Sequence, residues 1–275
     1  MLSFQNQVNA IGGFAFLIAG GYFVSEFTRS RETPPCSTRF PAATQMSFQK
    51  TDGAPMTPAE FQARVGMGEH GVIEKTAVRR TGGAYPLVLD VKIGGPGSGD
   101  FGAGFFWTPS GLQAPSSACL AYNVQVPQDF DYATGGMLPG LYGANPSAAA
   151  GAQAGFAGRV MWSNSGAFGV ETNLSDFNMA QSGQPLLHRS VAVLPRGRWV
   201  SVEQEIVLNS PNAKDGLLKL WVDGRLVIDI SDIAWRGASF ALTGVLADVG
   251  YLASHEASDK KATALTLSPL QLSWQ

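Results

Sequence analysis

The sequence predicts an all-β protein, a β-jelly-roll sandwich preceded by one N-terminal transmembrane helix. Short runs of alternating apolar and polar residues recur along the chain, with turn residues between them and almost no helical periodicity. The 33 glycines suit a chain with many turns. An uncharged apolar run lies near the N-terminus. At 275 residues, the chain is long enough for one large sandwich plus an anchor.

The apolar run extends from Val8 to Val24, and the first ionisable side chain is Glu26. About 20 apolar residues span a bilayer core, so residues 1–25 are predicted to be an anchor. A cleaved signal peptide is less favoured because no basic residue precedes the run and no small-residue cleavage site follows it. A buried core helix is the third alternative. The lipid-embedded residues of the anchor would be Phe14, Ala15, Leu17, Ile18 and Ala19.

The anchor has two further implications. Ala15 and Ala19 form a small-x-x-x-small pair, which allows close helix packing, so another membrane protein is a candidate partner besides the lipid. Arg29, Arg31 and Arg39 follow the run, and the positive-inside rule would place them in the cytoplasm. Long domains can translocate despite such charges, and the resemblance given below favours a periplasmic or extracellular domain on a single-pass membrane protein.

Residues 26–45 are interpreted as a linker and residues 46–275 as the folded domain. A capping box at Thr57–Glu60, with proline at the first helical position, predicts a short helix near the start of the domain. The clearest hairpin is 218–230, where Asp223 and Gly224 separate two alternating runs. The expected strands are 85–93, 101–107, 117–126, 155–163, 198–208, 216–222, 225–230, 240–250 and 262–273. Residues 144–155 are small and of low complexity, and they predict a loop.

Composition excludes several classes of function. The net charge is −2 and no Lys/Arg run exists, so a nucleic-acid partner is not expected. No cofactor motif is present, and two cysteines and three histidines without ligand spacing argue against a metal site. Outside the cytoplasm, Cys36 and Cys119 would be able to form a disulfide; two unrelated thiols are the alternative.

Four stretches resemble polysaccharide lyase family 14, which contains alginate and polyuronate lyases. Residues 120–131 resemble its aromatic strand and the turn after it, and residues 135–143 (GGMLPGLYG) resemble its G-G-K-L-P-G-L-x-G motif. Residues 155–162 resemble its F-S-x-R-x-M-W strand, and residues 198–224 resemble a later strand pair. The resemblance implies a jelly roll whose concave sheet binds an acidic polysaccharide. It also implies β-elimination, in which a base removes a proton and polar groups stabilise the developing charge.

The sequence departs from the family at the residues that carry this chemistry. Met137 stands where the family has lysine, and Ala157 stands where it has serine. Arg159 matches the family's arginine, and the stretch 169–173 contains none of the expected tyrosines. Losing one catalytic group usually costs orders of magnitude in rate, so the scaffold is predicted to be a pseudoenzyme.

The remaining candidates come from individual residues. Tyr122, Met137, Tyr142 and Arg159 are the expected glycan-groove residues, and Arg159, His188 and Tyr142 are the candidates for a rearranged catalytic group. Trp162 and Trp221 are expected in the core, and residues 163–166 are expected to form a hairpin turn.

Three functions remain open from the sequence. The first is a membrane-anchored, non-catalytic module that binds a glycan or serves as an accessory subunit of a membrane complex. The second is an active polyuronate lyase with rearranged groups. The third is a structural subunit whose groove is filled by its own loop 144–155.

Overall fold

The computed structural model describes residues 33–40, 42–65, 70–94, 102–144, 155–174, 186–236, 240–252 and 261–275. Residues Pro35–Gln275 form one compact unit. The predicted anchor and almost all of the predicted loop 144–155 lie outside the described residues. In the part of the chain that is described, no helix has both the length and the apolar character needed to cross a membrane.

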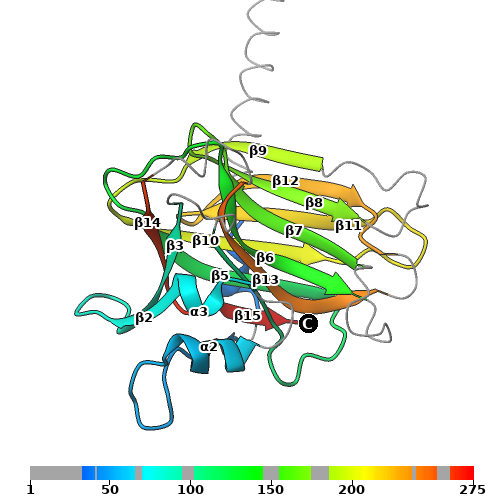
Figure 1. The fold of residues 1–275 in the computed structure, drawn as a ribbon. Coiled ribbons are helices and arrows are strands. Elements are labelled where there is room, and N and C mark those ends of the chain that lie inside the picture. The colour runs from blue at the N-terminus through cyan, green and yellow to red at the C-terminus, as the bar shows by residue number, and fades with distance from the viewer. Residues whose placement is uncertain are drawn as a thin grey trace, which may run out of the picture. The chain divides into compact units, whose positions relative to one another are not determined.

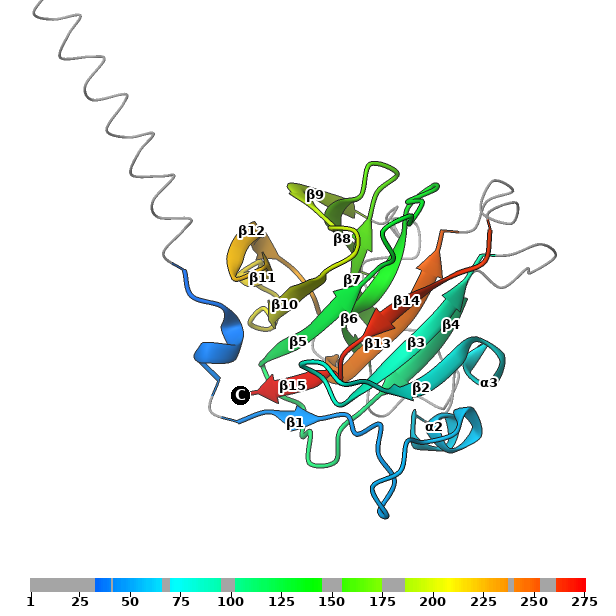
Figure 2. The same ribbon diagram turned by 90° about the vertical axis from the view of Figure 1, so that its left-hand side faces the viewer.

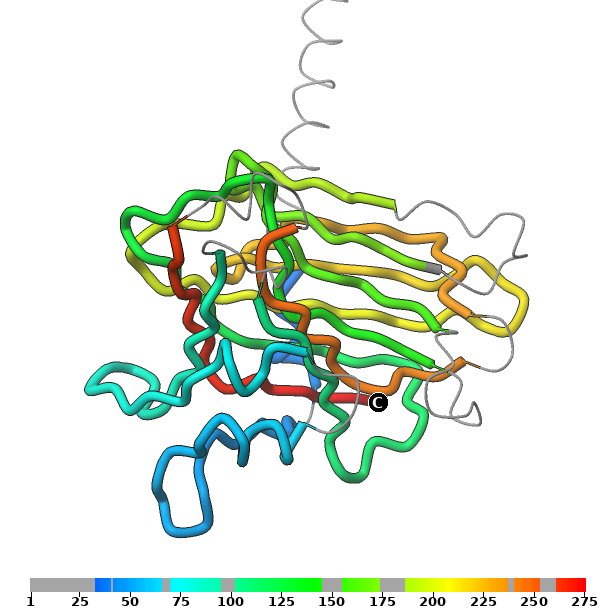
Figure 3. Tube along the Cα trace, viewed as in Figure 1, coloured from blue at the N-terminus to red at the C-terminus, as the bar shows by residue number. Residues whose placement is uncertain are grey.

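Two antiparallel sheets lie face to face and form a β-sandwich, as the jelly-roll prediction requires (Figure 1, Figure 2). The nine-stranded sheet has the order β12 (Arg225–Ile233), β11 (Gly216–Val222), β10 (Trp199–Val207), β5 (Ser117–Gln125), β14 (Thr263–Leu267), β3 (Leu87–Ile93) and β2 (Thr76–Arg80). Beyond this path, β15 (Gln271–Trp274) pairs with β5, and β1 (Thr44–Gln45) pairs with β15. β14, which is near the C-terminus of the chain, therefore runs beside β3, as Figure 3 shows.

The six-stranded sheet has the order β4 (Gly102–Trp107), β13 (Ala241–Tyr251), β6 (Gly136–Ala144), β7 (Gly155–Trp162), β8 (Ala167–Leu174) and β9 (Leu186–Val193). Leu138, Val160 and Phe168, which point inward from β6, β7 and β8, are fully buried. Trp162 and Trp221 are also buried, which confirms their assignment to the core.

Local signals gave several elements correctly. The β11–β12 hairpin turns at Asp223 and Gly224, both with positive φ. Residues 163–166 form the β7–β8 turn, in which the Gly166 amide donates to the Ser163 carbonyl. The helix α2 (Pro58–Val65) begins with the predicted capping box, since Thr57 and Glu60 exchange hydrogen bonds. A second, four-residue helix, α3 (Val72–Lys75), follows it.

Other elements differ from the prediction. The strands β2, β6, β8 and β9 were not predicted, and the expected strand 262–273 is two strands, β14 and β15. The connection between them contains Pro269, which has no amide hydrogen for a sheet ladder.

The compact unit also includes residues ahead of position 46. Residues 35–45, interpreted above as linker, belong to the compact unit. Cys36 lies in a 3-10 helix (Cys36–Thr38) and is joined to Cys119 on β5 by a disulfide. β1 adds to the edge of β15, and Arg39 forms an ion pair with Glu205. The sequence offered the Cys36–Cys119 disulfide as one alternative, whereas the β1 pairing and the Arg39 ion pair had no signal in the local apolar pattern.

A β-bulge in β6 is held from the opposite sheet. The register of β6 on β7 shifts between Leu138 and Leu141, around Pro139 and Gly140. The buried side chain of Gln204, on β10, accepts from the Leu141 amide at 2.7 Å and donates to the Gly158 carbonyl at 2.8 Å.

Two further features complete this buried network. The Tyr122 hydroxyl donates to the Pro139 carbonyl at 3.0 Å. A β-carbon at Gly158 would lie 3.0 Å from Gln204 Nε2, so the glycine leaves the room that the amide occupies. The backbone groups at the bulge therefore find their partners across the core.

Gln204→Leu should lower the free energy of unfolding by about 2 to 4 kcal/mol, because it leaves the Leu141 amide and the Gly158 carbonyl buried without a partner. Tyr122→Phe, which removes one hydrogen bond and keeps the ring, should cost about 1 kcal/mol. Urea denaturation of both variants measures the difference. Equal stabilities for Gln204→Leu and the native protein would contradict this account of the bulge.

Replacing both Cys36 and Cys119 by alanine should lower the free energy of unfolding by about 2 to 4 kcal/mol, because the disulfide closes a long loop in the unfolded chain. Urea denaturation with and without dithiothreitol gives the test. Reductant should destabilise the native protein and leave the double variant unchanged. If dithiothreitol left the free energy of unfolding of the native protein unchanged, this would argue against the disulfide.

Candidate functional site

The outer face of the six-stranded sheet gathers most of the residues predicted for a groove. On β7, Ala157, Arg159 and Met161 alternate with the core residues Phe156, Val160 and Trp162, so they point to the outer side of the sheet. Of these three, Ala157 and Met161 are buried and Arg159 is partly exposed. Met137 pairs with Met161, and Tyr142 pairs with Ala157. The structure therefore places Met137, Tyr142 and Arg159 on one face.

The bulge in β6 makes this grouping possible. Met137 and Tyr142 are five residues apart, an odd spacing that would put them on opposite faces of a regular strand. The extra residue at Pro139–Gly140 reverses the alternation, so that Leu138 and Leu141 both point into the core. Met137 and Tyr142 then both point outward.

Arg159 is the cation at the centre of this face. Its Nη1 lies 3.7 Å from Oε1 of Glu171, which pairs with it across β7 and β8. Its Nε is buried and has no hydrogen-bond partner. The Arg159 side chain is 31% exposed, so the part of the guanidinium that reaches the surface can donate to an acceptor such as another carboxylate.

The neighbours of Arg159 are mainly apolar. Met137 and Met161 are side by side on β6 and β7, and Leu246 on β13 lies on the same face, next to Phe106 on β4. Methionine neither donates a proton nor neutralises a carboxylate. Met137 therefore presents a side chain suited to packing on apolar or C–H surfaces.

Tyr142 is the hydroxyl-bearing residue of this group. Its ring packs on Phe106 with centroids 5.0 Å apart, and its hydroxyl lies 3.5 Å from Thr108 Oγ1. Burial raises the pKa of the Tyr142 hydroxyl above its ordinary value, and the Thr108 hydrogen bond opposes this in part. Tyr142 is therefore a neutral phenol at neutral pH.

Two predicted residues lie elsewhere. Tyr122 is buried between the sheets with its hydroxyl on Pro139, so it supports β6 from inside and does not line the outer face. His188 pairs with the inward residue Val170, and its Nε2 lies 3.4 Å from Thr172 Oγ1. Burial lowers the pKa of His188, and the ring lies on the other side of the sheet from Arg159.

Sequence reasoning missed other residues of this face. Glu171 could have been found, because the turn at 163–166 fixes the β7–β8 register that sets it opposite Arg159. His70 lies over Gly104 with its Nε2 3.7 Å from Asp248 Oδ1. No local signal connects His70 to Asp248, since they meet only through the pairing of β4 with β13.

A metal centre finds little support among the described residues. The one group of three potential ligands there is Cys36, Cys119 and Glu203. Both sulfur atoms are in the disulfide, so neither is a thiolate ligand.

The fold and this face define a β-sandwich of the polysaccharide-lyase type. The model of the family described as polysaccharide lyase 14 matches residues 95–251, more than half of the chain. The chain therefore belongs to the polysaccharide lyase 14 family, which confirms the resemblance seen in its motifs. No curated protein matches the sequence.

Solved structures of lyases share the fold. The marine PL-14 alginate lyase from Aplysia kurodai is similar at 19% identity with a TM-score of 0.63, over 76% of this chain and 90% of that chain. The alginate lyase vAL-1 from Chlorella virus has 19% identity and a TM-score of 0.59, over 76% and 91%. The endo-β-1,4-glucuronan lyase from the fungus Trichoderma reesei has 13% identity and a TM-score of 0.54, over 77% and 90%. At these identities the likeness shows the fold.

We expect the pKa of the Tyr142 phenol to lie above the ordinary value for tyrosine, because burial disfavours the phenolate. NMR titration of tyrosine ring carbons, with the signal assigned by Tyr142→Phe, measures the pKa. Thr108→Val should raise the pKa further, since the Thr108 hydroxyl stabilises the phenolate. A pKa of 10 or below would contradict the burial argument and restore Tyr142 as a candidate base.

Proposed function

We propose that this protein is a membrane-anchored, extracytoplasmic module that binds an acidic glycan on the outer face of its six-stranded sheet and does not cleave it. The observation that carries the proposal is the state of Arg159. Its buried Nε has no hydrogen-bond partner, and the β6 residues that pair with Met161 and Ala157, on either side of Arg159 along β7, are Met137 and Tyr142.

The binding part of the proposal rests on matched chemistry. A uronate carboxylate would accept hydrogen bonds from Arg159, in competition with Glu171 at 3.7 Å. The C–H faces of the sugar would pack on the partly exposed side chains of Met137 and Tyr142. The alginate and glucuronan lyases of the same fold support an acidic polysaccharide as the ligand class.

The non-catalytic part rests on what surrounds Arg159. Elimination needs a base within hydrogen-bond reach of the sugar and an acid for the leaving oxygen. Met137 supplies neither, and His188 faces the other side of the sheet. The membrane anchor and the extracytoplasmic location are also part of the proposal. The apolar run 8–24 supports the anchor. The Cys36–Cys119 disulfide supports the location, because disulfides are typical of oxidising compartments.

An active lyase is the second candidate. Glu171 favours it, because its carboxylate lies beside Arg159 on the outer face. In such an enzyme, Glu171 would take the C5 proton while Arg159 binds the substrate carboxylate. The C4–O bond would break as the double bond between C4 and C5 forms, and the leaving oxygen would take a proton from water. Glu171→Gln would then abolish turnover.

For the first candidate, the full chain in a zwitterionic detergent is incubated with polymannuronate, polyguluronate or polyglucuronate. Ultraviolet absorbance, which detects the 4,5-unsaturated uronate, should show no product. The protein should bind at least one oligosaccharide of these polymers in isothermal titration calorimetry. Arg159→Ala should weaken that binding by about tenfold or more, whereas Arg225→Ala, an exposed arginine on the other sheet, should not.

Glu171→Gln separates the two candidates further. If Glu171 only competes for Arg159, this variant should bind the oligosaccharide at least as tightly as the native protein. Accumulation of unsaturated product by the native protein would overturn the non-catalytic proposal. Unchanged affinity in Arg159→Ala would overturn the binding site.

A further inference from the structure

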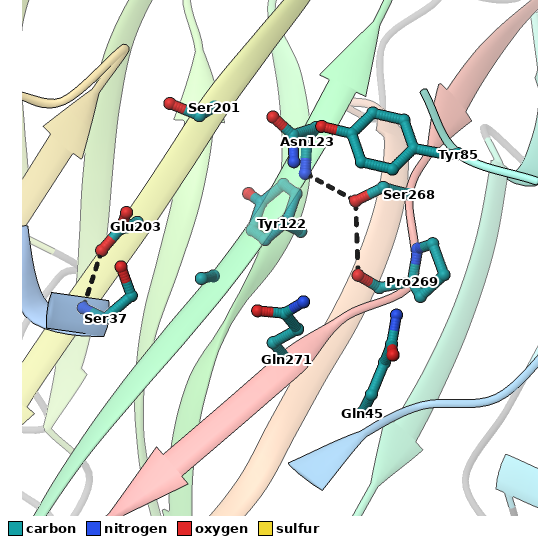
Figure 4. A pocket seen from close by; sticks show the side chains of 11 residues that line it. Ser37, Gln45, Tyr85, Tyr122, Asn123, Ser201, Glu203, Ser268, Pro269 and Gln271 are labelled. Atoms are coloured by element: carbon teal, nitrogen blue, oxygen red, sulfur yellow. Dashed lines mark hydrogen bonds between the residues drawn. The ribbon is translucent and has the colours of Figure 1, made fainter. Parts of the chain in front are cut away.

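A polar pocket lies on the other side of the molecule, on the outward surface of the nine-stranded sheet (Figure 4). Its volume is about 180 Å³. Drug-sized ligands occupy pockets of roughly 300 to 1,000 Å³, so this one has room for a single small unit. It shares no lining residue with the outer face that carries Arg159.

The position of the pocket follows from strand register. Glu203 on β10 pairs with Ala121 on β5, which pairs with Gln271 on β15, which pairs with Gln45 on β1. These four side chains form one row across the sheet and point away from the core. Ala121 is the small member of the row, so a hollow opens above it between longer polar side chains.

Side-chain amides surround this hollow. Asn123 lies two residues beyond Ala121 on β5 and pairs with Ser201. In Figure 4, Asn123, Gln271 and Gln45 stand around the space between β5, β15 and β1. None of the three amide groups makes a hydrogen bond to a described residue. Each offers two donors and one acceptor, the mixture that hydroxyl groups match.

An aromatic ring forms one wall. Tyr85, just before β3, packs edge-on against Trp199 with centroids 5.0 Å apart. This contact fixes a ring with an apolar face and a polar tip beside the amides. Such a ring suits a ligand that carries C–H groups on one side and hydroxyls at its rim.

The charge of the pocket excludes an acidic ligand. Glu203 is the one ionisable acid or base that lines it at neutral pH, and no described lysine or arginine does so. The Glu203 carboxylate already accepts from the Ser37 amide at 2.9 Å, and its second oxygen can accept from a hydroxyl. A uronate would meet like charge here without a cation to compensate.

We propose that this pocket binds one uncharged, hydroxyl-rich unit, a neutral sugar residue. The amides and Glu203 recognise its hydroxyls, and Tyr85 packs against its ring. The proposal is independent of glycan binding at Arg159, because the two sites lie on opposite sheets.

The test uses the full chain in a zwitterionic detergent, because detergents with sugar headgroups would compete. Cellotriose, maltotriose and mannotriose are the neutral probes, and trimannuronate is the acidic one. At least one neutral probe should shift the side-chain amide NMR signals of Asn123 and Gln271. Ala121→Phe, which fills the hollow, should weaken its binding by about tenfold or more.

The matched control is Ala77→Phe, on the exposed face of β2 in the same sheet, which should bind like the native protein. Thermal unfolding checks that both variants fold. If Ala121→Phe does not fold, Asn123→Ala gives a second test of the same pocket. The proposal is overturned if no neutral probe binds, if Ala121→Phe binds as tightly as the control, or if trimannuronate displaces the neutral probe. Arg159→Ala should leave the neutral-sugar signals unchanged, so failure at one site is distinguishable from failure at the other.

Discussion

The hydrogen bonds of Gln204 are the constraint on which the candidate groove depends. The core of a β-sandwich normally contains few side-chain amides. The Gln204 amide nevertheless extends from β10 to the opposite sheet, where it forms hydrogen bonds with two backbone groups at the β6 bulge. Tyr122 satisfies a third. Without these partners, the backbone groups at the bulge would be buried without hydrogen bonds. If β6 were a regular strand with no bulge, Tyr142 would point into the core. The composition of the outer face is therefore decided by residues on the opposite sheet.

This dependence separates the residues that hold the two strands in place from the residues on the outer side of the sheet. The groups that hold β6 and β7 in place are Gln204, Tyr122 and Gly158, and all three lie inside. Met137 and Ala157, where the motif comparison predicted departures from the family, are on the outer side of the sheet and take no part in these hydrogen bonds. Outward positions on a sheet can change with little cost to the fold, because core packing is carried by the alternate side chains.

Local sequence predicted the fold class, the hairpin at Asp223–Gly224 and the capping box at Thr57, because each depends on neighbouring residues. It did not predict β6 as a strand, since its glycines and Pro139 are poor strand formers that tertiary contacts hold in place. Met137, Tyr142 and Arg159 were found through motif resemblance. Tyr122 was placed in the groove because an aromatic motif residue does not reveal which way it points. The pairing of His70 with Asp248, and the row from Glu203 to Gln45, depend on long-range register and had no local signal.

The disulfide between Cys36 and Cys119 determines how a mechanical load on the chain would be carried. A pull applied ahead of Pro35 would pass through a covalent bond directly to β5, a central strand paired with β10 along nine residues. Shearing that many hydrogen bonds at once resists force far better than unzipping them singly. The two-residue strand β1 and helix α2, which follow in the chain, would carry none of the tension. If the domain were held at its N-terminal end and loaded by a bound polymer, the force would therefore act on β5, inside the nine-stranded sheet.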